Sequence, residues 1–151
     1  MGRKFLAVIV AMITAVAIIW LTYMVATATA PFYPKNLEYM SPEEVAAYTS
    51  SVPPITYIID LVGYAIAAFA AGFIATKMGR RWSPGITLAL ITGVLLSAGE
   101  IAMAVIGNAG ISVIWPQPMW FIVASVVLFV PISLIGYVFA HRVGHAAILT
   151  A

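Results

Sequence analysis

The chain contains no cysteine and very little charge: of its 151 residues, 8% are charged and 64% are hydrophobic. The absence of cysteine excludes disulfide bonds, thiol redox chemistry and metal sites built on thiolates. Soluble domains carry about 25% charged residues and about 45–50% apolar ones. Because a water-facing surface cannot be built from so little charge, lipid must be the solvent. The sequence predicts a membrane protein with a single domain, residues 1–151.

Four apolar runs are each long enough, at about 20 residues, to span the hydrocarbon core of a bilayer as a helix. Two of the runs are uncharged, and each of the other two contains a single acidic residue. Helices of soluble proteins have a polar face, and these runs have almost none. We therefore expect an all-α membrane protein, a four-transmembrane-helix bundle. The expected helices cover residues 5–27, 55–76, 85–107 and 119–140.

The first apolar run is expected to be a membrane anchor and not a cleaved signal peptide. Ala28-Thr29-Ala30 resembles the small-residue site at which signal peptides are cut. The run is longer than the roughly 7–15 apolar residues of a signal peptide, however, and Pro31 follows where the cut would fall.

Basic residues flank the four runs unevenly, and cytoplasmic loops carry an excess of Lys and Arg. One side of the membrane receives only Lys35, together with Glu38, Glu43 and Glu44. The other side receives six basic residues, namely Arg3, Lys4, Lys77, Arg80, Arg81 and Arg142. This distribution predicts that both termini and residues 77–84 are cytoplasmic. Basic residues that border apolar runs in this way do not indicate nucleic-acid binding.

The outer loop, residues 28–54, is the longest polar segment and contains a helix start. The Ser41 side chain can cap free backbone amides, Pro42 suits the first helical position, and Glu44 completes a capping box. We expect a short extra helix at about residues 42–49.

Two carboxyl groups lie inside apolar runs, Asp60 in the second and Glu100 in the third. An ionised carboxylate near the centre of a bilayer costs about 2.5–3.5 kcal/mol on insertion scales. At about 1.5 Å per residue, Asp60 lies roughly 9 Å from Pro54 and Glu100 roughly 10 Å from Gly107. Because a short loop joins the second and third helices, we expect the two acids at a similar depth on neighbouring helices.

Three interpretations of these two acids remain open. In the first, each carboxyl is protonated or hydrogen-bonded within the bundle. In the second, the carboxyls dock a partner. In the third, the pair binds a proton or a cation for transport. The hydrogen-bond partners expected within the bundle are Thr22, Tyr23, Tyr57 and Ser97.

Small residues recur every four positions on two of the expected helices. Such stripes let helix backbones approach closely in a membrane, where no hydrophobic force drives helices together. On the second helix the stripe consists of Gly63, Ala67, Ala71 and Ala75, with Tyr64, Ala68 and Gly72 beside it. On the third helix it consists of Ala89, Gly93 and Ser97. The stripes pack inside this bundle or against another chain, and the two acids beside them are expected to face protein.

The remaining candidates for chemistry are weak. His141 and His145 lie four residues apart, a spacing that can place two metal ligands on one helix face. Without a third ligand, solvation at the membrane surface is the expected role of both. Pro131 interrupts the fourth run and indicates a kink or a hinge. We find no nucleophile–base pair, phosphate-binding loop or metal-ligand cluster, and we expect no enzymatic activity, cofactor or metal.

Several segments resemble a family of small, uncharacterised four-helix bacterial integral membrane proteins. They are the start MGRKFLAVIV, PFYP at 31–34, SPEEVAAYTSSVP, AAFAAGFIATKMGRR and PQPMW, followed by a helix with Pro131 and Gly136. The most specific element is Pro116-x-Pro118-x-Trp120. The resemblance implies the same topology in the bacterial inner membrane and brings no known activity. Small multidrug exporters also have four helices, but their key glutamate lies in the first, where this chain has no acid.

The leading functional hypothesis is a non-enzymatic accessory or assembly subunit of a larger membrane protein complex. Its partners would be the lipid bilayer and other membrane subunits or further copies of itself. The alternative is a small transporter or an ion- or proton-coupled carrier that uses Asp60 and Glu100. A third hypothesis is a helper of a membrane enzyme that shapes access for lipid or quinone.

Overall fold

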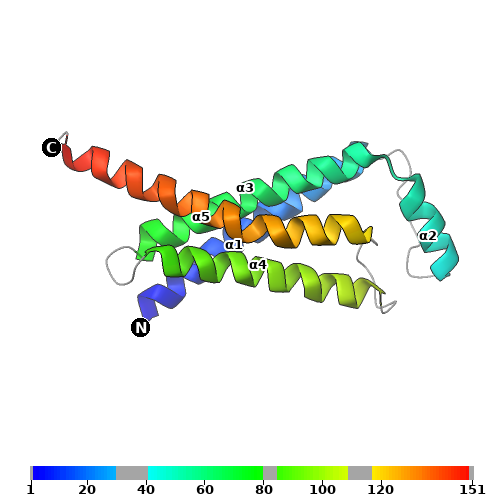
Figure 1. Ribbon diagram of the computed structural model, residues 1–151, viewed down its shortest axis with the longest axis horizontal. Coiled ribbons are helices and arrows are strands. Elements are labelled where there is room, and N and C mark those ends of the chain that lie inside the picture. Colours follow the sequence, from blue (N-terminus) through cyan, green and yellow to red (C-terminus); the bar gives the residue numbers. More distant parts are fainter. Residues whose placement is uncertain (1, 30–40, 80–84, 109–116, 150–151) are drawn as a thin grey trace.

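A computed structural model describes residues 2–29, 41–79, 85–108 and 117–149, and every element in this part of the chain is an α-helix (Figure 1). Four of the helices are long and apolar enough to cross a membrane, as in a multi-pass membrane protein. The predicted all-helical fold with four spans is thereby confirmed. The helices are α1 (Gly2–Thr29), α2 (Pro42–Ser51), α3 (Pro54–Gly79), α4 (Gly85–Asn108) and α5 (Met119–Leu149).

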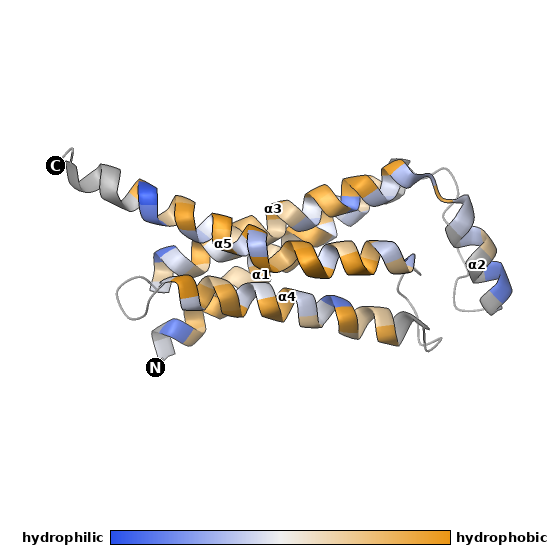
Figure 2. Ribbon diagram, viewed as in Figure 1, coloured by the Kyte–Doolittle hydropathy of each residue, from blue (hydrophilic) through white to orange (hydrophobic). Residues whose placement is uncertain are grey.

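The helix α3 is the centre of the bundle. It packs along α1 on one side and α5 on the other, and it also contacts α4. The helix α4 packs mainly on α5 and touches α1 only lightly. Apolar residues run along all four spans, as Figure 2 shows by colour. The span in α1 has the smallest buried share of the four, because α3 is its main neighbour.

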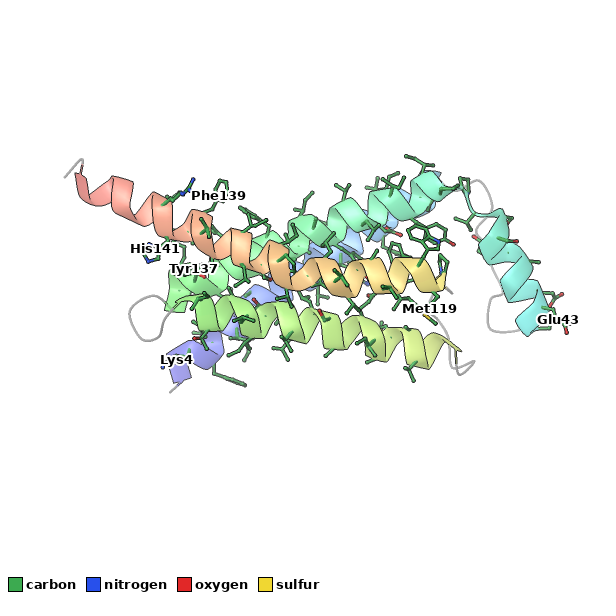
Figure 3. The ribbon with its side chains drawn as sticks, viewed as in Figure 1. Lys4, Glu43, Met119, Tyr137, Phe139 and His141 are labelled. Carbon is green, nitrogen blue, oxygen red and sulfur yellow. The ribbon has the colours of Figure 1, made fainter. Side chains whose placement is uncertain are left out.

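The chain ends and α2 lie at opposite ends of the bundle (Figure 1). The start of α1 and the last turns of α5 lie at one end, together with the end of α3 and the start of α4. Lys4 and His141 mark this end in Figure 3, whereas Glu43 and Met119 mark the other. The exposed cations Lys77 and Arg142 belong to the first of these ends.

The helix α2 begins at a complete capping box. The backbone N–H of Glu44 donates to the Ser41 hydroxyl (3.3 Å), and the backbone N–H of Ser41 donates to the Glu44 carboxylate (2.7 Å). The second of these bonds is the main reason why the pKa of Glu44 lies below its ordinary value. At the other end, the N–H of Val52 donates to the carbonyl of Tyr48 (3.2 Å). The helix runs to Ser51, slightly past the expected end at residue 49.

The helix α5 continues past the expected end at residue 140 to Leu149. The apolar run ends at Ala140 because His141 and Arg142 follow it. Helical hydrogen bonds lie within the backbone and do not require an apolar surface, so the helix extends beyond the apolar run.

Candidate functional site

One stripe of α3 is buried along the whole helix except at Asp60 and Leu61, which are partly exposed. The buried residues recur at intervals of three or four, which is the spacing of one helix face. They are Thr56, Tyr57, Gly63, Tyr64, Ala67, Ala68, Ala71, Gly72, Ala75, Thr76 and Gly79. Asp60 lies one turn before Gly63 and Tyr64, so the stripe carries a carboxyl group into the bundle.

The small residues of this stripe lie inside the bundle. Ala67, Ala71 and Ala75 are fully buried. A Cβ atom at Gly63 would overlap the side chain of Thr22 on α1. One at Gly72 would overlap the carbonyl oxygen of Ser133 on α5. Glycine at these two positions therefore lets α3 approach a different helix on each side.

A second close contact joins α4 to α5. A Cβ atom at Gly93 would lie 2.9 Å from the Cα of Val130. One turn further along α4, the Ser97 hydroxyl donates to the backbone carbonyls of Gly93 and Val126, at 3.1 Å each. Ser97 thus links α4 to α5 and is not a hydrogen-bond partner of the acids.

Two sets of small residues were not recognised from the sequence. Ala7, Ala11 and Ala15 on α1 are fully buried, and they repeat every four residues as the predicted stripes do. Gly136 of α5 packs on the backbone of α3, since a Cβ there would overlap the carbonyl of Phe69. The four-residue repeat of alanine on α1 could have been recognised in the sequence, whereas Gly136 belongs to no such repeat of small residues.

Glu100 on α4 is buried, with 9% of its surface exposed, and its hydrogen-bond partners come from two other helices. The Ser125 hydroxyl of α5 lies 3.4 Å from Glu100 Oε1 and 2.9 Å from the carbonyl oxygen of Ile122, so its one proton is shared between these two acceptors. The Tyr64 hydroxyl of α3 also hydrogen-bonds to this carboxyl group. The carboxyl of Glu100 therefore joins α3, α4 and α5.

Asp60 on α3 lies close enough to Glu100 for the two carboxyl groups to interact electrostatically. The structure thus brings together two acids that are 40 positions apart in the sequence. Asp60 Oδ1 is buried and has no hydrogen-bond partner among the described residues. Thr22, one of the expected partners, donates to the carbonyl of Ile18 instead (2.9 Å).

Tyr64 connects Glu100 to the end of the bundle where α5 begins. The Gln117 side chain, two residues before α5, donates to the Tyr64 hydroxyl (3.4 Å). The Tyr64 ring stacks on Phe129 with centroids 5.4 Å apart, and it meets Phe121 edge-on at 5.6 Å. Polar side chains thus form a series from Gln117 through Tyr64 to Glu100, enclosed by aromatic rings.

No cation is available within the apolar runs to balance these two carboxyl groups. Ionising both would place two like charges close together in a medium of low polarity, which is strongly unfavourable. The arrangement can therefore retain a proton or hold a cation. Lys, Arg and His are absent from residues 5–27, 55–76, 85–107 and 119–140.

Both histidines lie in the part of α5 beyond the apolar run. The ring of His141 meets Tyr137 at 5.7 Å in an edge-on contact, and the side chain of His145 lies outside the described residues. Within the part of the chain that was searched, no group of three or more His, Asp or Glu side chains could hold a metal ion.

The resemblance to small bacterial membrane proteins was compared with known families, curated proteins and solved structures. It stays a prediction, since no protein-family model, no curated protein and no solved structure matches this chain.

Proposed function

We propose that this protein is a non-enzymatic integral membrane accessory or assembly subunit, which binds other membrane proteins or further copies of itself through α4. The observation that carries the proposal is the position of Gly99. It faces away from the bundle, and a Cβ atom added there would meet nothing within 4 Å.

The other glycines make Gly99 informative. Among the described glycines within the four spans, every one except Gly99 lies in close contact with another part of the chain. Glycine in a helix interior is about 0.8–1 kcal/mol less favourable than alanine, so it needs a packing reason. At Gly99 the described part of the chain supplies no such reason.

The surroundings of Gly99 have the composition of a helix–helix interface in a membrane. Ala98 and Ala102 are exposed next to it, in a small-xxx-small pattern. Ile91 and Leu95 extend the same exposed face by two turns. Small residues on one face allow another helix to approach closely, with van der Waals contacts that lipid chains match less well. We call this surface, Ile91 to Ala102, the α4 outer face.

Substitution on the α4 outer face tests the proposal. Ala98→Leu and Ala102→Leu should release co-purifying chains, or dissociate a self-assembly, in native mass spectrometry after extraction in a gentle detergent. Ala17→Leu is the matched control, because Ala17 is also exposed within a span, on α1. The proposal is wrong if the wild type carries no partner, or if Ala17→Leu releases the partner as fully as Ala98→Leu does.

The proposed orientation places the end with Lys4, Lys77 and Arg142 in the cytoplasm of a bacterium and α2 outside the inner membrane. The positive-inside rule supports it, since these cations lie at one end and the acidic side chains of α2 at the other. With four spans, both termini then lie on the cytoplasmic side.

A second candidate function is a small transporter or carrier coupled to a proton or cation through Asp60 and Glu100. The observation that favours it is the burial of Glu100 near Asp60 in a bundle whose apolar runs contain no basic residue. Ionisable groups within spans commonly mark ion or proton pathways. The close contacts at Gly63, Gly72 and Gly93 oppose it, because they leave little room for a path along the bundle.

A further inference from the structure

We propose that the first half of α5, residues 119–130, is a hinged cover over Glu100 that pivots at Pro131 while the second half of α5 stays fixed. The movement takes place within the bundle and is compatible with either proposed function. It rests on three features of α5: a fixed half, an interruption and a half held mainly by side chains.

The fixed half begins immediately after Pro131. The backbone of Ser133 contacts Gly72, and Gly136 contacts the backbone of Phe69 so closely that neither glycine could carry a Cβ. The Ser133 hydroxyl also donates to the carbonyl of Ala68 (3.1 Å). Backbone atoms of two helices in direct contact cannot rearrange as side chains do. This half of α5 and α3 therefore form one rigid unit.

The interruption is Pro131 itself, which lies inside α5. Proline has no backbone N–H, so the helical hydrogen bond to the carbonyl of Val127 cannot form. The proline ring also crowds the preceding turn, and sharp bends in helices occur mostly at such residues. Resistance to bending is consequently lowest at the boundary between the two halves.

The cover is held mainly by side chains, apart from the close backbone contact of Gly93 with Phe129 and Val130, which lie next to the hinge. Ser125 donates to Glu100 and Gln117 donates to Tyr64, both at 3.4 Å, which is long for bonds of these kinds. Phe121 is fully buried and packs on Tyr64, so apolar contact also holds the cover closed. The backbone of Val126 accepts one further bond, from Ser97 (3.1 Å).

No helix of the described chain lies on the outer side of the cover. Its outward side chains Met119, Trp120, Val123 and Val127 are 52–69% exposed, in a shallow apolar groove that ends near Pro131. Movement outward would therefore meet none of the described helices. Because Ser125 belongs to the cover and Gln117 precedes it by two residues, opening would withdraw a donor from Glu100 and another from Tyr64. The carboxyl pair would then be reached from the end of the bundle where α5 begins.

Distances between spin labels test this cover, and the lack of cysteine allows each label to be placed alone. One pair, Val105→Cys on α4 and Val123→Cys on α5, measures the cover. The control pair, Leu90→Cys on α4 and Val138→Cys on α5, measures the fixed half. All four positions are exposed. In lipid nanodiscs, double electron–electron resonance should give a broad or double distance distribution for the first pair and a narrow one for the control.

Two variants make the test decisive. Pro131→Ala should narrow the distribution of the first pair, because it restores the missing helical hydrogen bond. Ser125→Ala should shift that pair toward longer distances, because it removes the contact with Glu100. Neither change should affect the control pair. A narrow wild-type distribution that Ser125→Ala leaves unchanged would overturn the proposal, as would equal widths for the two pairs. If one of the two variants fails to fold, the distance distribution of the other is sufficient to test the cover.

Discussion

The carboxyl of Glu100 on α4 accepts a hydrogen bond from Ser125 on α5, 25 positions later in the chain, while Asp60 on α3 lies near enough to interact with it electrostatically. Three helices thus contribute to one polar cluster within an apolar bundle. Neutral amides can accept the same hydrogen bonds as carboxyls but cannot ionise, so amide and apolar substitutions separate the possible roles of these acids.

For the second candidate function, Asp60→Asn or Glu100→Gln should abolish ion flux in reconstituted vesicles and leave folding and assembly intact. If the carboxyls serve only packing or docking, the amides should have little effect. Glu100→Leu should then destabilise the bundle by about 1–3 kcal/mol, because it leaves the buried Tyr64 hydroxyl without its acceptor, whereas Ser125 keeps its bond to the carbonyl of Ile122. Vesicle flux and thermal unfolding, measured on the same three variants, distinguish the outcomes. Wild-type flux that both amides eliminate would favour the carrier.

Labelling of single cysteines tests the orientation. Lys4→Cys and Met78→Cys should react with an impermeant maleimide only from the cytoplasmic side, and Glu43→Cys only from outside. All three residues are exposed, so only the side of the membrane on which each lies should decide whether the reagent reaches it. Met78 is preferred to its neighbour Gly79 as the labelling position, because a Cβ at Gly79 would overlap Leu88. Reaction of Met78→Cys from outside would contradict the four-span orientation.

The number and rough extent of the helices could be predicted because the four apolar runs leave no other way to bury backbone groups in lipid. The start of α2 could be predicted because the capping box uses four consecutive residues, Ser41 to Glu44. A local pattern of this kind specifies the backbone geometry through contacts between residues that are close in the sequence. The end of α5 could not be read in the same way, since the apolar run shows where lipid contact stops and not where the helix does.

The partners of Glu100 could not be predicted from the sequence. In a helix that is apolar all round, hydropathy does not show which face turns toward which neighbour, so the contribution of Ser125 from α5 had no signal. Ser97 lies one turn from Glu100 and was expected to be a partner, yet it bonds to the backbone of α5. Depth along the helix was predictable from residue counting, whereas rotation about the axis depended on contacts at Gly93 and Gly72.

The capping box of α2 makes a prediction about local stability. Ser41→Ala should destabilise α2 by about 1 kcal/mol, the usual contribution of a serine cap. Amide hydrogen exchange should then be several times faster in α2 and unchanged in the middle of α3. Ser50→Ala is a suitable control, because the Ser50 hydroxyl bonds to the carbonyl of Ala47 near the other end of α2. Equal exchange in the two variants would show that Ser41 does not stabilise the helix.

The same capping box predicts a pH dependence. Because the pKa of Glu44 is lower in the folded helix than its ordinary value of 4.5, its contribution is present above pH 4.5 and is lost as the pH falls below it. The NMR shift of the Ser41 amide proton, which bonds to the Glu44 carboxylate, should follow this transition with a midpoint below 4.5. Glu44→Gln should remove the transition. A midpoint at or above 4.5 would contradict the hydrogen bond.

Two glycine substitutions with the same chemistry should have opposite effects on stability. Gly72→Ala forces a methyl group against the carbonyl of Ser133, and overpacking of this kind typically costs about 1–3 kcal/mol. Gly99→Ala adds the same methyl group where nothing lies within 4 Å, so only the better helix propensity of alanine remains, about 0.8–1 kcal/mol in favour of the helix. In mild detergent, thermal unfolding of Gly72→Ala should therefore occur below the wild-type temperature, and that of Gly99→Ala at or above it. Equal stability of the two variants would mean that α3 and α5 do not approach as closely at Gly72 as the structure shows. A loss of stability in Gly99→Ala would mean that another helix already packs on the α4 outer face in the detergent-solubilised protein.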